Sequence, residues 1–176
     1  MADTVKIAVC DDEKNIRSYL ASLIKKQGGE CNITEYSSAD AYLSDGREHD
    51  LIFQDTEMGD SGGGLDGIGL ARHIRGMETQ KQPVIIFVTG YEKYVYDAFD
   101  IGAFQYLVKP VDEQKFAEVF GRAVGQILSE AEQRKKKHVM LNRLDVLSDS
   151  YQQQMYRCMA AGMLFSSAFT WHCLRR

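Results

Sequence analysis

The chain has 176 residues, of which 44% are apolar and 26% charged, so it can form one globular domain with an appendage rather than two full domains. Its two prolines and 15 glycines exclude collagen-like or proline-rich sequence, and its longest weakly polar stretch, 160–169, is too short to span a membrane. The four cysteines show no CxxC pairing, and the N-terminus lacks a signal-peptide pattern. We therefore expect a cytoplasmic protein without a zinc site or disulfide framework.

Charge is divided unevenly along the chain. Residues 1–133 hold 13 lysines and arginines against 23 acidic residues, whereas residues 134–176 hold eight against two. The front part should avoid phosphate-rich surfaces, and the rear part could approach them. The run Arg134-Lys135-Lys136-Lys137 is interpreted first as a solvated helix end, with a nucleic-acid role as the alternative.

Up to about residue 130, short β-branched runs alternate with amphipathic segments, a pattern typical of parallel strands joined by crossover helices. The predicted strands are 5–10, 33–36, 50–54, 84–88 and 104–108. The predicted helices are 13–26, a short one capped by Ser38, one through 68–74, 92–101, and 112 to about 137. Gly28 and Gly29 should end the first helix, and the last one should bury Phe116, Val119, Phe120, Ala123, Ile127 and Leu128.

These elements predict an α/β fold with a doubly wound, five-stranded parallel sheet in three layers. We assign residues 1–130 to this domain, 131–138 to a basic linker or helix extension, and 139–176 to an irregular or helical tail. The tail shows no clear period and is too short for a full DNA-binding domain.

Polar residues follow four of the predicted strands at their carboxyl ends, where doubly wound sheets bind ligands. Three carboxylates in one place repel one another, and Mg²⁺, a hard cation that prefers oxygen ligands, would resolve that repulsion. A lysine and a threonine nearby could stabilise charge on a phosphoryl group while an aspartate attacks phosphorus. Any single residue has a simpler explanation, such as a helix cap or a solvated lysine, but the joint pattern favours a site. The residues are Asp11, Asp12, Asp55, Thr89 and Lys109.

The sequence resembles the receiver domain of two-component response regulators over about residues 4–130. The matching stretches are VCDDE (9–13), LIFQDTEM (51–58), LDGIGLARHIR (65–75), IIFVTGY (85–91) and AFQYLVKPV (103–111). The resemblance implies a flavodoxin-like fold with strand order 2-1-3-4-5. It also implies a switch that a sensor histidine kinase phosphorylates, rather than an enzyme acting on other substrates.

By this resemblance Asp55 is the phosphoacceptor. Asp12 and Asp55 would bind Mg²⁺ together with the backbone carbonyl of Glu57, and Asp11 would bind it through water.

The resemblance also implies that Thr89 and Lys109 contact the phosphoryl group and that the bond before Pro110 is cis. Thr89 and Tyr106 would move together as the switch, and the fourth helix and fifth strand could form a homodimer.

The aromatic series around Tyr91, Tyr94 and Tyr106 is similar to that of receivers carrying LytTR-type DNA-binding domains. The sequence departs from the family between Met58 and Leu65, where a Gly-rich insertion at 59–64 replaces the usual Pro. This loop should alter metal affinity and dephosphorylation rate. The tail lacks the length of a LytTR output domain, so we expect a truncated or altered C-terminal region.

Three other functions compete with this interpretation. A DNA-binding regulator of LytTR type with an incomplete output domain is the main alternative. A phosphatase with an aspartate nucleophile should carry that aspartate after the first strand, whereas Asp55 follows the third. An FMN-binding module needs a phosphate loop after the first strand, where Asp11 and Asp12 would repel phosphate.

Overall fold

The computed structural model describes residues 4–58, 65–79, 81–90 and 100–160, so the helix predicted at 92–101 lies almost wholly outside them. Five parallel strands form one sheet in the predicted order, β2-β1-β3-β4-β5. The strands are β1 (Val5–Cys10), β2 (Cys31–Tyr36), β3 (Leu51–Asp55), β4 (Val84–Thr89) and β5 (Gln105–Val108). The helices are α1 (Lys14–Lys26), α2 (Ala39–Asp45), α3 (Gly67–Gly76) and α5 (Glu113–Ala160).

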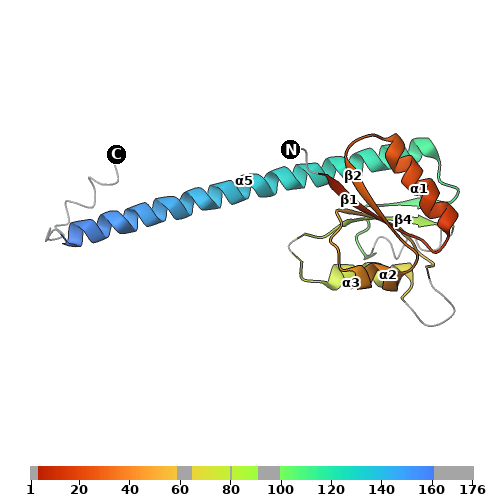
Figure 1. The fold of residues 1–176 in the computed structure, drawn as a ribbon, viewed down its shortest axis with the longest axis horizontal. Coiled ribbons are helices and arrows are strands. Elements are labelled where there is room, and N and C mark those ends of the chain that lie inside the picture. Colours follow the sequence, from red (N-terminus) through yellow and green to blue (C-terminus); the bar gives the residue numbers. More distant parts are fainter. Residues whose placement is uncertain (1–3, 59–64, 80, 91–99, 161–176) are drawn as a thin grey trace. The chain divides into compact units, whose positions relative to one another are not determined.

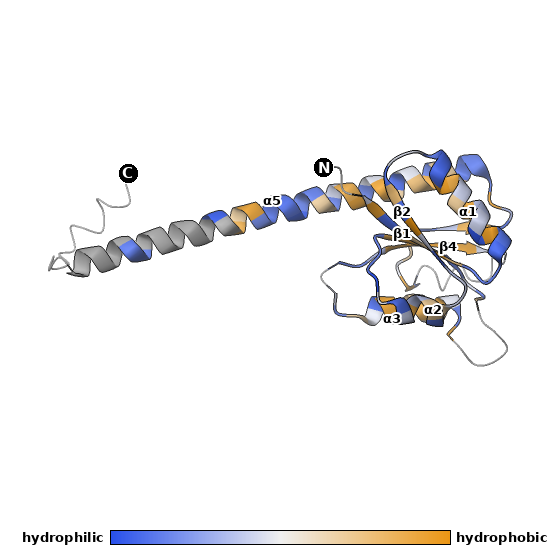
Figure 2. Ribbon diagram, in the orientation of Figure 1, coloured by the Kyte–Doolittle hydropathy of each residue, from blue (hydrophilic) through white to orange (hydrophobic). Residues whose placement is uncertain are grey.

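Alternating strand residues divide the interior into two apolar clusters, one on each face of the sheet. Ile7, Phe53 and Ile86 pack with residues of α1 and α5, whereas Ile52 and Ile85 pack with residues of α2 and α3. Every residue of β3 and β4 is buried, which explains why these strands are nearly continuous apolar runs. Figures 1 and 2 show the resulting layers, with hydrophobic strands in orange between the two pairs of helices.

Short-range signals explain several helix ends. Ser38 caps α2 by accepting a hydrogen bond from Ala41 N at 3.1 Å. Asp66 caps α3 in the same way, accepting from Gly69 N at 2.6 Å. After α1 the backbone turns through Gly28, whose φ of 73° lies in the left-handed region that favours glycine.

Helix α5 is longer than the sequence pattern predicts. Its backbone remains helical to Ala160, so the described part of the tail is helical. The chain contains neither Gly nor Pro from 126 to 160, and a helix can continue through such sequence without an apolar stripe. The prediction that Leu128 is buried was wrong: it is 40% exposed, because it lies about 100° round the helix from the buried Ile127.

The chain divides into two units, Met1–Ser129 and Glu130–Arg176. All residues of both apolar clusters lie in the first unit. Within the described residues, no helix combines the length and the apolar character needed to cross a membrane.

Candidate functional site

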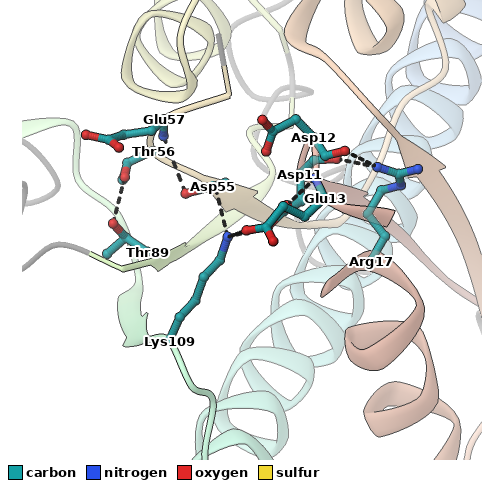
Figure 3. A network of polar contacts seen from close by, with 9 residues as sticks. All are labelled: Asp11, Asp12, Glu13, Arg17, Asp55, Thr56, Glu57, Thr89 and Lys109. Carbon is teal, nitrogen blue, oxygen red and sulfur yellow. Dashed lines mark hydrogen bonds and ion pairs between the residues drawn. The ribbon is translucent and has the colours of Figure 1, made fainter. Parts of the chain in front are cut away.

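The carboxyl ends of the strands bring the predicted polar residues to one edge of the sheet (Figure 3). Asp11 directly follows β1, Asp55 and Thr89 are the last residues of β3 and β4, and Lys109 directly follows β5. β1 and β3 are neighbours in the sheet. After β1 the chain continues to β2 on one side of this pair, and after β3 it continues to β4 on the other side. Side chains can converge at such a reversal of strand order.

Three carboxylates form a cluster at this point. Asp11, Asp12 and Asp55 each offer an oxygen within 4.8 Å of the other two. Asp11 and Asp55 are buried, whereas Asp12 is exposed. Negative charges this close, two of them shielded from water, destabilise one another unless positive charge is supplied.

Lys109 supplies part of that positive charge. Its Nζ lies 2.9 Å from Asp55 Oδ2, 2.8 Å from Asp11 Oδ2 and 3.6 Å from Glu13 Oε1. Burial lowers the pKa of Lys109, but its interactions with Asp11 and Asp55 together outweigh burial, so the pKa lies above its usual value. The ammonium therefore stays charged and bridges two of the three carboxylates. The peptide bond between Lys109 and Pro110 is cis.

Asp11 is the most deeply placed member of the cluster. Burial raises the pKa of Asp11, and the opposing effects of Lys109 and of the Glu13 N–H, which donates to Oδ1 at 2.8 Å, do not cancel that rise. Oδ2 of Asp11 lies 2.8 Å from Lys109 Nζ, and Lys109 shares its ammonium between this oxygen and Asp55 Oδ2. This oxygen, among three carboxylates with one bridging ammonium, fits a divalent cation such as Mg²⁺.

Arg17 holds the loop that carries the first two carboxylates, and sequence reasoning missed it. Its Nη1 donates to the backbone carbonyls of Asp11 at 2.7 Å and Asp12 at 3.0 Å, and its Nε lies 3.6 Å from Glu35 Oε2. A cation in the first turn of a helix opposes the helix dipole. The position of Arg17 in the first turn of α1 therefore indicated that its positive charge would be paired with oxygen atoms of nearby residues.

The Thr89 hydroxyl contacts a residue that the sequence analysis did not single out. Oγ1 of Thr89 lies 2.7 Å from Oγ1 of Thr56, and both side chains are buried. Tyr106, predicted to move with Thr89, is 37% exposed and pairs in register with Phe87, two residues before Thr89. The paired movement of Thr89 and Tyr106 stays a prediction.

The backbone after Asp55 lies directly against the start of α3. Gly67 N donates to Thr56 O at 3.1 Å, and Gln54 Nε2 donates to Gly67 O. Glu57 N donates to Asp55 Oδ1 at 3.4 Å, so the Glu57 backbone passes beside the carboxylate. That its carbonyl binds metal stays a prediction. The Gly-rich insertion at 59–64 lies outside the described residues.

Two LytT proteins are among the curated relatives of the chain. It is 29% identical over 116 residues to the sensory transduction protein LytT of Bacillus subtilis, covering 65% of this chain and 46% of that protein. It is 32% identical over 135 residues to LytT of Oceanobacillus iheyensis, covering 76% and 53%. The chain thus spans about half the length of these relatives. The similarity is consistent with the predicted LytTR-type subgroup.

Solved structures share the fold. The response regulatory domain of mrkE from Klebsiella pneumoniae superposes with a TM-score of 0.64 at 23% identity, covering 71% of this chain and 99% of that one. The BeF3-activated DrrB receiver domain gives a TM-score of 0.60 at 22% identity, covering 70% and 99%. Residues 7–120 match the response regulator receiver domain family. This match, which takes in most of the sheet and the carboxylate cluster, shows that the chain belongs to the receiver domain family of two-component response regulators.

Proposed function

We propose that the chain accepts a phosphoryl group on Asp55 from the phosphohistidine of a sensor histidine kinase. The observation that carries the proposal is the bridge from Lys109 to Asp55 and Asp11 inside a cluster of three carboxylates. The protein acts as a self-catalysed phosphoacceptor and turns over no other substrate.

The chemistry follows from the charges around the acceptor. An Asp55 oxygen attacks phosphorus, the bond from phosphorus to the imidazole nitrogen breaks, and that nitrogen leaves with the electron pair. Lys109 provides positive charge beside the phosphoryl oxygens, and Thr89 can donate its hydroxyl hydrogen to one of them. Asp11, Asp12 and Asp55 would hold Mg²⁺, which when bound neutralises charge on the phosphoryl oxygens.

The first test replaces the acceptor. After incubation with acetyl phosphate and Mg²⁺, the intact mass of the wild-type chain should increase by one phosphoryl group. Asp55→Asn should show no increase, because an amide lacks the anionic oxygen that attacks phosphorus. Asp100→Asn removes an exposed carboxylate outside the cluster and should label like wild type.

A chelator added before acetyl phosphate should also prevent labelling of the wild-type chain. Labelling of Asp55→Asn to the wild-type extent, or labelling that ignores the chelator, would contradict the proposal. Peptide mapping of the labelled wild-type chain then identifies the modified residue.

The LytT relatives favour a second function, that of a transcriptional regulator that binds DNA. Phosphorylation would control this regulator by promoting a dimer formed through the helix predicted at 92–101 and β5. β5 leaves Tyr106 and Val108 exposed, as such an interface requires. A shift of DNA fragments by the full chain that weakens steeply with salt would support this function.

A further inference from the structure

Thr56 and Thr89 form a hydrogen bond between two hydroxyl groups beside the acceptor. Their Oγ1 atoms lie 2.7 Å apart, and the two residues are only 1% and 2% exposed. Thr56 directly follows Asp55 at the end of β3, and Thr89 ends the neighbouring strand β4. The bond therefore joins the residue after the acceptor to the residue expected to contact the phosphoryl group.

The directions of these side chains separate them from the acceptor carboxylate. In Figure 3 the hydroxyls of Thr56 and Thr89 point toward each other, whereas the Asp55 carboxylate is joined to Lys109. Because the Thr89 hydroxyl points toward Thr56, we expect the Thr89 side chain to turn when it contacts a phosphoryl oxygen on Asp55. Thr56 has almost no exposed surface, so water cannot readily replace Thr89 as its partner.

We propose that Thr56 is a positioning residue for Thr89, holding its hydroxyl in the resting arrangement so that phosphorylation must break this bond. The inference rests on the proposed function of Asp55. The Thr56 hydroxyl stabilises the resting state alone and therefore opposes the switch. A hydroxyl that supported Thr89 equally in both states would leave the switching equilibrium unchanged.

The test compares variants that remove or keep the hydroxyl at position 56. Thr56→Val retains the β-branched shape without the hydroxyl, and Thr56→Ser retains the hydroxyl. Each folded chain is titrated with beryllofluoride, a mimic of the phosphoryl group, in the presence of Mg²⁺, and bound fluoride is followed by fluorine NMR. Thr56→Val should reach half-occupancy at about tenfold lower beryllofluoride, and Thr56→Ser within about twofold of wild type.

A second pair of variants asks whether the effect acts through Thr89. In a chain carrying Thr89→Val, the further change Thr56→Val should leave the midpoint unchanged, because the bond is already absent. Urea unfolding of each variant verifies that it is folded, and Thr56→Ala provides a smaller replacement with the same expected direction.

Several outcomes would overturn the role of Thr56. These are a higher midpoint for Thr56→Val, an unchanged midpoint, or an equal effect with and without the Thr89 hydroxyl. If the folded wild-type chain takes up no beryllofluoride, the result contradicts the proposed function of Asp55 and, with it, the role of Thr56. If all variants take up beryllofluoride with the same midpoint, the result contradicts the role of Thr56 and leaves the proposed function of Asp55 in place.

Discussion

His49 is buried and Lys109 is half-buried, but of the two only Lys109 contacts carboxylates. Lys109 bridges Asp55 and Asp11, and these partners raise its pKa despite burial. His49 packs against two aromatic rings that also contact each other, with ring centroids 5.7 Å from Tyr36 and 5.5 Å from Tyr42. Its Nε2 lies 3.4 Å from the Tyr36 hydroxyl, and the effects of Asp45 and of the Arg47 backbone, which raise its pKa, are smaller than the effect of burial. Burial therefore dominates and lowers the pKa of His49.

The lowered pKa of His49 predicts that the fold loses stability in mild acid. The folded state favours the neutral imidazole, so this contribution is complete above the usual pKa of 6.5 and is lost as pH falls through the lower pKa of the folded state. One such group changes the unfolding free energy by at most about 1.4 kcal/mol per pH unit. Urea unfolding of His49→Gln between pH 7.5 and 5 should show a shallower decline than wild type.

His138→Gln is the matched control, because His138 is exposed and lies in the second unit. With His138→Gln, the unfolding free energy of the first unit should decline between pH 7.5 and 5 as steeply as in the wild-type chain. An equally steep decline in His49→Gln would assign the acid sensitivity to other groups.

At the scale of elements, the junction between β3 and α3 depends on one glycine. A Cβ on Gly67 would lie 1.7 Å from the carbonyl oxygen of Asp55 and 2.8 Å from its carbonyl carbon, both backbone atoms that cannot turn aside. Gly67 N also donates to Thr56 O at 3.1 Å. The start of α3 can therefore lie against the acceptor only because this position has no side chain.

Gly67→Ala should force α3 away from the end of β3 and lower the unfolding free energy by about 1–3 kcal/mol or more. It should also slow labelling by acetyl phosphate, since Asp55 lies at the displaced junction. Gly121→Ala is the contrasting control: nothing lies within 4 Å of a Cβ there, in α5, and the change should stabilise the fold by about 0.5–1 kcal/mol. Equal effects of the two substitutions on urea unfolding would contradict this account.

At the scale of the whole molecule, the core belongs to the first unit. The last buried residue of its apolar clusters is Ile127, two residues before the boundary at Ser129. Three aromatic rings stack where α5 packs against the sheet. The ring centroids of Phe53 and Phe116 are 5.2 Å apart, and those of Phe116 and Phe120 are 5.8 Å apart. The beginning of α5 is therefore part of the core, whereas its exposed basic run at 134–137 is not.

A fragment of residues 1–129 should consequently fold and label with acetyl phosphate like the full chain. A fragment of residues 1–121 lacks Ala123 and Ile127 and should be less stable by about 2–5 kcal/mol, the cost of losing a large buried aliphatic side chain. Urea unfolding of both fragments beside the full chain measures the difference. Loss of folding in the longer fragment would show that the second unit stabilises the first.

The sequence by itself determined the α/β architecture, since buried strands and amphipathic helices have local patterns of apolar residues. It also placed Asp11, Asp55 and Lys109 at one edge, because parallel strands bring their carboxyl ends together. The strand order and the family were predicted from the resemblance of five sequence stretches to receiver domains.

Only the tertiary structure revealed Arg17 as the clamp on the acidic loop and Thr56 as the partner of Thr89. Spacing along the chain does not indicate which hydroxyl or carbonyl from another segment will lie within hydrogen-bond distance. The exposure of Leu128 and the continuation of α5 to Ala160 were likewise decided by packing and by helix propagation. Local periodicity reports which way a residue faces, but contacts within about 3 Å depend on how separate elements pack.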